Sequence, residues 1–243
     1  MPGAPPPAIC APGAFATYDG VSELWSPCVT RRGSFIAEST YLQNASAVGG
    51  TNYAAYPMLE LRTGVLPRLE FAFHTPSQVA ESGRNGTGLY PATRLGYGLR
   101  YAAFAAPRLA VALATDILPP MSRFSPNHVQ SRYVLGVSSA YRLTRRLTLG
   151  LSASGTSSAK VGFSRLLPAQ ALQASYEIGR RTQLSVDLGN RQPAAKAFQA
   201  FGDIALDQAF SRRVALKIGA GTAFNTAMGS KAHYLASGID YRM

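Results

Sequence analysis

From Ser34 to the end of the chain, apolar and polar residues alternate with a period of two. Residues 95–101 read Leu-Gly-Tyr-Gly-Leu-Arg-Tyr, and residues 184–188 read Leu-Ser-Val-Asp-Leu. Successive side chains of a strand point to opposite faces, so this period indicates strands with one apolar and one polar face. No stretch shows the period of an amphipathic helix. We therefore predict an all-β chain.

The connections between these strands alternate in length. Short turns are predicted at 66–68, 106–108, 144–146, 179–181 and 211–213, each of them followed by an alternating strand. Longer segments rich in Gly, Ser, Asn and Pro lie between them, at 44–52, 76–91, 118–130, 155–165, 190–197 and 225–231. This pattern predicts a series of hairpins with tight turns at one end and loops at the other. It gives about twelve strands, with both chain ends on the side of the short turns.

Residues 34–243 are therefore predicted to form a closed antiparallel transmembrane β-barrel, with short periplasmic turns and longer external loops. The composition agrees, because 47% of residues are hydrophobic and only 15% charged, while the mean hydropathy is +0.01. Lipid on one face and water on the other explain these values. Soluble alternatives fit less well: a propeller would place four strands in each repeat of about forty residues, and a lipocalin-like barrel needs only eight strands.

The chain carries 24 Lys and Arg against 12 Asp and Glu, a net charge of +12. The Arg residues lie in short clusters at turns, and we find no stripe of basic and aromatic residues of the kind that binds nucleic acid. We therefore expect no nucleic-acid partner. At the periplasmic rim these clusters would meet anionic outer-membrane lipid. The alternative is that they are solvated turn charges with no role toward lipid.

Residues 1–33 form a Pro-rich segment that precedes the barrel. The segment holds both cysteines of the chain, Cys10 and Cys28, and we predict a disulfide between them, which implies an oxidising compartment. Two unpaired thiols are the alternative. The segment is long enough either to plug a narrow lumen or to extend into the periplasm. A bacterial outer-membrane location is expected, with the leader peptide that this chain lacks already removed.

The polar phase of the strands predicts which charged residues face the lumen. Acids concentrate in the later strands and Arg in the earlier ones, so we expect ion pairs across a lumen that twelve strands leave narrow. The predicted lumen and constriction residues are Glu60, Arg62, Glu70, Arg94, Arg100, Asp116, Arg132, Glu177, Asp187, Asp203, Asp207, Lys217, Asp240 and Arg242.

The sequence offers no arrangement of catalytic residues. The segment 136–140, Gly-Val-Ser-Ser-Ala, departs from the nucleophile-elbow pattern at its last position and lies within a strand. His74 lies close in sequence to Ser77, but a single His of this kind is expected to be a polar lumen residue. The two cysteines are isolated from the three histidines. We therefore expect no enzyme activity, no metal site and no cofactor.

The segment 59–71, Leu-Glu-Leu-Arg-Thr-Gly-Val-Leu-Pro-Arg-Leu-Glu-Phe, resembles a strand–turn–strand unit of the outer-membrane transporter family named for the meta-cleavage pathway of phenol degradation. Residues 141–149 and 234–241 fit the same pattern, and the resemblance covers 34–243. Two departures are that residues 1–33 have no counterpart, and that the chain ends in Met243 where barrels usually end in an aromatic residue.

The resemblance implies a barrel with a transport role and brings no catalytic residues. We therefore expect a channel or transporter for small solutes, including apolar or aromatic compounds. The alternative is a plugged, non-conducting barrel with a structural or assembly role in the cell envelope. The solute, the oligomeric state and any protein partner are not predicted.

Overall fold

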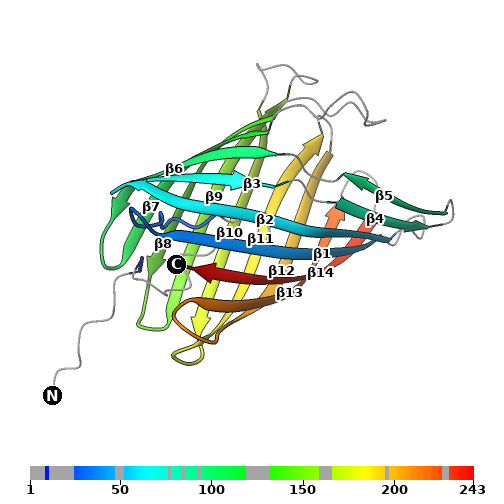
Figure 1. Cartoon of the computed structure of the whole chain (residues 1–243). Coiled ribbons are helices and arrows are strands. Elements are labelled where there is room, and N and C mark those ends of the chain that lie inside the picture. Colours follow the sequence, from blue (N-terminus) through cyan, green and yellow to red (C-terminus); the bar gives the residue numbers. More distant parts are fainter. Residues whose placement is uncertain are drawn as a thin grey trace.

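The computed structural model describes residues 9–10, 25–46, 52–75, 78–83, 86–91, 95–118, 132–158, 166–194, 197–225 and 230–243. These residues form fourteen antiparallel strands (Figure 1). The strands are β1 (Phe35–Ser46), β2 (Asn52–Leu66), β3 (Leu69–His74), β4 (Gln78–Gly83), β5 (Gly86–Pro91), β6 (Gly96–Ala105), β7 (Leu109–Leu118), β8 (Arg132–Arg142), β9 (Leu147–Ser158), β10 (Leu167–Glu177), β11 (Thr182–Ala194), β12 (Ala197–Ala209), β13 (Val214–Asn225) and β14 (Ser230–Arg242). Within the described residues, no helix is long and apolar enough to cross a membrane.

Twelve of the strands close into a barrel, as the sequence predicts. From β6 to β14 each strand pairs with the next along the chain, and β3 joins β2 to β6. The ring is completed by β1, which pairs with β14 on one side and with β2 on the other. Closure leaves no unpaired edge around the ring, and this is the condition for strands that span a lipid bilayer.

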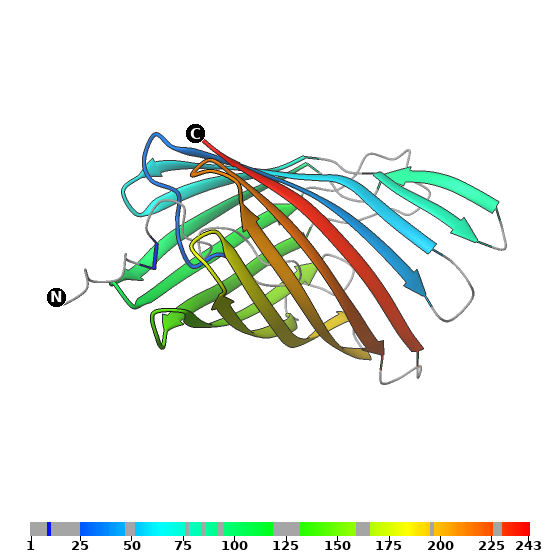
Figure 2. The same ribbon diagram turned by 90° about the horizontal axis from the view of Figure 1, so that it is seen from below.

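The two remaining strands are β4 and β5, which form a hairpin outside the ring. The sequence predicts a long loop over 76–91, and this detail is wrong, because most of these residues form strands. The hairpin adds to the outer half of β2, where Asn52–Tyr56 pairs with β4. It projects past the rim at the end where the long connections lie (Figures 1 and 2). On the side of β2, strand pairing therefore continues beyond the closed ring at the end where the long connections lie.

The lipid-facing phase of the strands is apolar, as predicted. Leu99, Leu149 and Val186 are each between 42% and 45% exposed, while their inward neighbours in sequence are largely covered. In β6 the burial alternates residue by residue from Gly96 to Ala103. Exposed apolar side chains on the outside of a closed ring are stable in lipid, because lipid takes the place of a second packed layer.

Both ends of the barrel chain lie at the short-turn end. Phe35 begins β1 and Met243 ends the chain, and their backbones exchange two hydrogen bonds, of 3.1 and 2.9 Å. The short turns lie at the same end of the barrel (Figure 1). They connect β6 to β7, β8 to β9, β10 to β11 and β12 to β13. The N-terminal segment therefore enters the barrel at this end.

Candidate functional site: the barrel lumen

The inner wall carries a cluster of charged side chains on β1, β2, β3, β6 and β7. Arg62 of β2 forms an ion pair with Glu38 of β1, and it lies 3.6 Å from Glu70 of β3. Arg100 of β6 lies 2.6 Å from Glu60 and 3.7 Å from Glu70. Arg62 and Glu70 are fully buried. Two arginines are thus held among three glutamates, an arrangement that compensates each charge within the wall.

His74 and Asp116 extend this cluster toward the outer end. The His74 ring lies 3.6 Å from Glu60 through Nδ1 and 3.3 Å from Asp116 through Nε2. Asp116 has room there because its neighbour across the strands is Gly98. A Cβ atom at Gly98 would come within 2.1 Å of an Asp116 oxygen. Glycine at this position therefore makes the His74–Asp116 contact possible.

A second cluster, rich in acids, lies on β11 to β14. Asp187 and Asp203 face each other directly across the β11–β12 pair, and the Tyr234 hydroxyl donates to Asp203 across 2.6 Å. Further along the wall, Asp207 stands directly opposite Lys217. Lys217 also interacts electrostatically with Asp187 and with Asp240 of β14. A single lysine thus faces several carboxylates on this wall.

The structure brings most of the predicted lumen residues onto the inner face. Glu60, Arg62, Glu70, Arg100 and Asp116 lie in the first cluster, and Asp187, Asp203, Asp207, Lys217 and Asp240 lie in the second. Glu177 ends β10 at the short-turn end. Arg132 begins β8 at the opposite end, and its side chain is outside the described residues. Arg94 also lies outside them.

The pairing within these clusters differs from the expectation. The sequence predicts ion pairs across the lumen, but the pairs seen among the described residues join strands that lie side by side or one strand apart in the wall: β2 with β1, β3 and β6, and β3 with β6 and β7. The register explains this, because Glu70 stands directly opposite Arg100, and Glu60 and Arg62 share the inner face of β2. Each arginine finds its partner without crossing the lumen.

Three contributors were not among the predicted site residues: Glu38, His74 and Tyr234. Glu38 and Tyr234 follow the inward phase of their strands, so the alternation could have placed both on the inner wall. The sequence predicts that His74 is a polar lumen residue but gives no partner for it. Its contact with Asp116 joins residues that are 42 positions apart. Only the strand register shows this contact.

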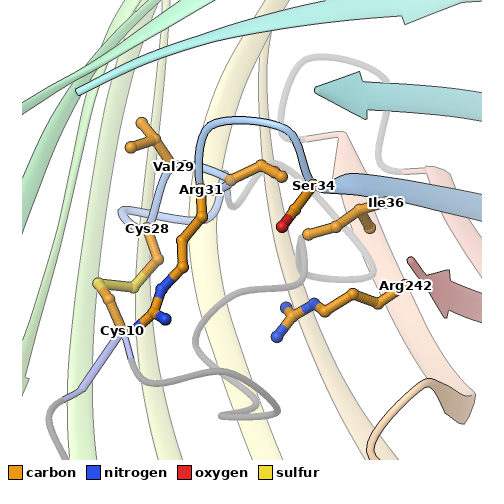
Figure 3. Close-up of a pocket in the computed structure, with 8 residues that line it drawn as sticks. Cys10, Cys28, Val29, Arg31, Ser34, Ile36 and Arg242 are labelled. Carbon is orange, nitrogen blue, oxygen red and sulfur yellow. A yellow bond between two sulfur atoms is a disulfide. The ribbon is translucent and has the colours of Figure 1, made fainter. Parts of the chain in front are cut away.

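The described part of the N-terminal segment, residues 9–10 and 25–33, lies against the inner wall at the short-turn end. This part begins against β7 and β8, where Ile9 and Cys28 pack on the inward-facing Ala110 and Ala140. Cys10 and Cys28 form a disulfide, as predicted, with their Cα atoms 5.3 Å apart (Figure 3). The disulfide therefore joins two described parts of the segment, and Ile9 and Cys28 beside it are buried against the wall.

Glycines in the wall make room for this segment. The Trp25 ring lies over Gly136 of β8, where a Cβ atom would come within 2.2 Å of it. On the other side of the lumen, a Cβ at Gly64 of β2 would come within 2.2 Å of the Arg31 carbonyl oxygen. Gly33 and Gly64 also share a backbone hydrogen bond of 3.0 Å. The segment thus crosses the interior from β8 to β2 in contact with bare backbone.

Thr30 joins this segment to the first charge cluster. Its backbone amide and its hydroxyl group both donate to one Glu70 carboxylate oxygen, and the contact is buried. Above this level the inner wall is wetter, because the side chains of Glu60 and His74 are 18% and 24% exposed. Among the described residues, the cluster is therefore partly exposed on its outer side and covered by Thr30 on the side of the N-terminal segment.

The comparisons with known proteins support the fold. No family model matches the chain, and no curated protein matches it. Among solved structures, an outer membrane channel from Pseudomonas putida F1 aligns with a TM-score of 0.67 at 14% identity, over 88% of this chain and 97% of that one. The NanC porin aligns with a TM-score of 0.55 at 12% identity, over 84% and 98%. The KdgM porin in complex with oligogalacturonate gives 0.53 at 8% identity, again over 84% and 98%.

At these identities the likeness concerns the fold. The chain covers almost the whole length of each of these barrels, and all of them are described as outer-membrane channels or porins. The chain therefore has the fold of a bacterial outer-membrane barrel with twelve strands.

Proposed function

We propose that this chain is a channel of the bacterial outer membrane for small solutes, with its periplasmic end narrowed by its own N-terminal segment. The observation that carries the proposal is the difference between the two sides of the charge cluster. On the outer side, the side chains of Glu60 and His74 are partly exposed. On the inner side, Glu70 is covered by Thr30. A water-accessible vestibule that ends at a constriction is the arrangement of a selective channel.

The constriction is formed by long side chains that can be shortened one at a time. Arg100 is 2% exposed and reaches Glu60 from β6 past β3, so it covers the inner wall between β6 and β2. Solutes that pass must move along this cluster and then beside the N-terminal segment. The resemblance seen in the sequence extends the proposal to apolar or aromatic solutes.

A non-conducting barrel with a structural or assembly role is the second candidate. It is favoured by the fit of the N-terminal segment, since Ile9 and Cys28 are each only 1% exposed against the wall. In that reading the charge cluster stabilises the barrel and nothing passes through it. The two candidates predict opposite results in a single measurement of ion conduction.

Planar-bilayer recordings decide between them. We expect small discrete conductance steps from the full chain, and larger steps when Arg100→Ala shortens one side of the constriction. Removal of residues 1–33 should enlarge the steps further. Arg180→Ala, in an exposed short turn, is the matched control and should leave the steps unchanged. A barrel that stays silent in all four forms would exclude the channel and leave the structural role.

A further inference from the structure

His74, the last residue of β3, is held between two carboxylates of the inner wall. Its Nδ1 atom lies 3.6 Å from Oε2 of Glu60 on β2, and its Nε2 atom lies 3.3 Å from Oδ1 of Asp116 on β7. Glu60 stands directly opposite His74 in register, whereas Asp116 reaches the ring from beyond β6. The imidazole ring therefore connects β2 to β7 across the inner face of the wall.

Two glycines of β6 leave room for this arrangement. Gly96 stands opposite His74, and Gly98 stands opposite Asp116. A Cβ atom at Gly98 would come within 2.1 Å of Oδ1 of Asp116, the same oxygen that faces the ring. The bare backbone of β6 therefore lets the Asp116 carboxylate lie against the strand, within reach of Nε2.

The protonation state of the ring decides whether both contacts can be made at once. A neutral imidazole has one N–H group and one bare nitrogen, whereas an imidazolium ion donates from both nitrogens. An ionised carboxylate only accepts hydrogen bonds. With each nitrogen of His74 directed at a carboxylate, the geometry suits the imidazolium ion. Loss of the proton turns one nitrogen lone pair toward a carboxylate, and that contact is repulsive.

The charged groups that face the ring come from three strands. They are Glu60 of β2, Asp116 of β7 and Arg100 of β6, which interacts with the ring electrostatically. Glu60 uses a separate oxygen for each partner, because Oε1 lies 2.6 Å from Arg100 while Oε2 faces His74. The side chains of His74, Glu60 and Asp116 are 24%, 18% and 11% exposed. Solvent therefore reaches all three groups, and the ring can exchange its proton with water.

We propose that His74 determines the ion selectivity of the constriction and makes this selectivity depend on pH. This role rests on the proposed channel function and adds the residue that regulates it. The charged ring donates to both Glu60 and Asp116. When the proton leaves, Glu60, which has the longer contact, loses the ring as a donor and keeps Arg100. The charge on the outer side of the constriction becomes more negative by one unit, and negative charge in a pore favours cations.

Reversal potentials in a gradient of potassium chloride test the proposal on the full chain in planar bilayers. Recordings are made at about pH 5 and about pH 9, on either side of the range in which an imidazole titrates. The ratio of potassium to chloride permeability should be at least twofold higher at the alkaline pH. His74→Gln should keep the alkaline ratio at both pH values. His74→Arg, whose guanidinium group stays charged, should keep the acidic ratio at both.

His233→Gln is the matched control. His233 is exposed and shares the outward phase of β14 with Leu235 and Ile239, which are 56% and 55% exposed. Its replacement should leave the pH dependence unchanged. Equal permeability ratios at the two pH values in the unmodified chain would overturn the proposal, and this comparison needs no variant to fold. A pH dependence that His74→Gln changes no more than His233→Gln does would overturn it as well.

A second measurement tests the ring without conduction. Nitrogen-15 spectra of the histidine rings are recorded for the full chain in detergent, and the signals of His74 are those that His74→Gln removes. At the alkaline pH the proton of the neutral ring should lie on Nε2, toward Asp116. Asp116→Ala should move this proton to Nδ1, toward Glu60, whereas Asp207→Ala, in the second cluster, should leave it on Nε2.

The two measurements separate the role of His74 from the channel function. A ring proton that does not respond to Asp116→Ala, in a barrel that conducts, would exclude the role of His74 alone. A barrel that never conducts, although the ring proton moves as expected, would exclude the channel alone.

Discussion

Thr30 of the N-terminal segment donates two hydrogen bonds to one carboxylate oxygen of Glu70, from its amide and from its hydroxyl group, each 2.5 Å long. Both residues are buried, and Glu70 also lies near Arg62 and Arg100. The segment is thus attached to the charge cluster of the wall. A substitution that weakens the Thr30–Glu70 contact should therefore change the conductance of the channel.

Thr30→Val removes the hydroxyl donor and keeps the shape and the amide. A hydrogen bond to a charged group contributes about 1.5–3 kcal/mol, so we expect the segment to leave its place at least tenfold more often. In bilayer recordings this should appear as more frequent large conductance steps. The control is Thr182→Val, because the Thr182 hydroxyl bonds the neutral Gln208 at the rim. Identical records for the two variants would show that Thr30 does not hold the segment.

Gly64→Ala tests the close approach of the segment to β2. The added Cβ would come within 2.2 Å of the Arg31 carbonyl oxygen, so the turn at 31–34 must move. We expect faster hydrogen–deuterium exchange at the amide of Gly33, which donates to the Gly64 carbonyl, and at the amide of Ser34, which donates to the Arg31 carbonyl. At Gly150 the nearest atom to a new Cβ would be 3.3 Å away. Gly150→Ala should therefore leave exchange at 31–34 unchanged, and protection that also survives Gly64→Ala would contradict the packing.

The barrel could be predicted from the sequence because the alternation of apolar and polar residues is visible between neighbouring positions of the chain. Leu99 and Arg100 are neighbours in the chain, and their opposite character alone places one in lipid and the other in the lumen. The number of strands, about twelve, could be predicted by counting the short turns and the long connections between them. The hairpin of β4 and β5 was missed because residues 76–91 are rich in loop-forming residues, and only pairing with the outer half of β2 gives them strand structure.

The ion pairs could not be predicted in the same way. The inward phase identifies Arg62 and Arg100 as lumen residues, but their partners depend on the register between strands, which the alternation of one strand does not contain. The contact of Arg31 with Gly64 has a weak signal in the sequence, since a glycine within a strand often marks a close backbone approach. Nothing in the sequence says which segment approaches it.

Val186→Arg tests the lipid-facing phase. Val186 is 42% exposed on the outside of β11, and an arginine near the middle of the bilayer costs about 2–4 kcal/mol. The free energy of unfolding in lipid vesicles should fall by that amount. Leu143 is also apolar and exposed, but it lies in the short turn between β8 and β9. Leu143→Arg should cost about 1 kcal/mol or less, and equal penalties at the two positions would mean that Val186 does not face the bilayer interior.

Asp187→Asn and Asp207→Asn should change the stability of the barrel in opposite directions. Asp187 is fully buried and stands directly opposite another acid, Asp203, and like charges in such a pair are destabilising by about 0.2–1 kcal/mol. Asparagine at 187 should therefore raise the free energy of unfolding. Asp207 stands directly opposite Lys217, so asparagine there removes an attractive pair and should lower the free energy of unfolding. Urea titration of each variant in lipid vesicles measures both effects. A loss of stability in Asp187→Asn as large as that in Asp207→Asn would show that the attraction between Asp187 and Lys217 outweighs the repulsion between Asp187 and Asp203.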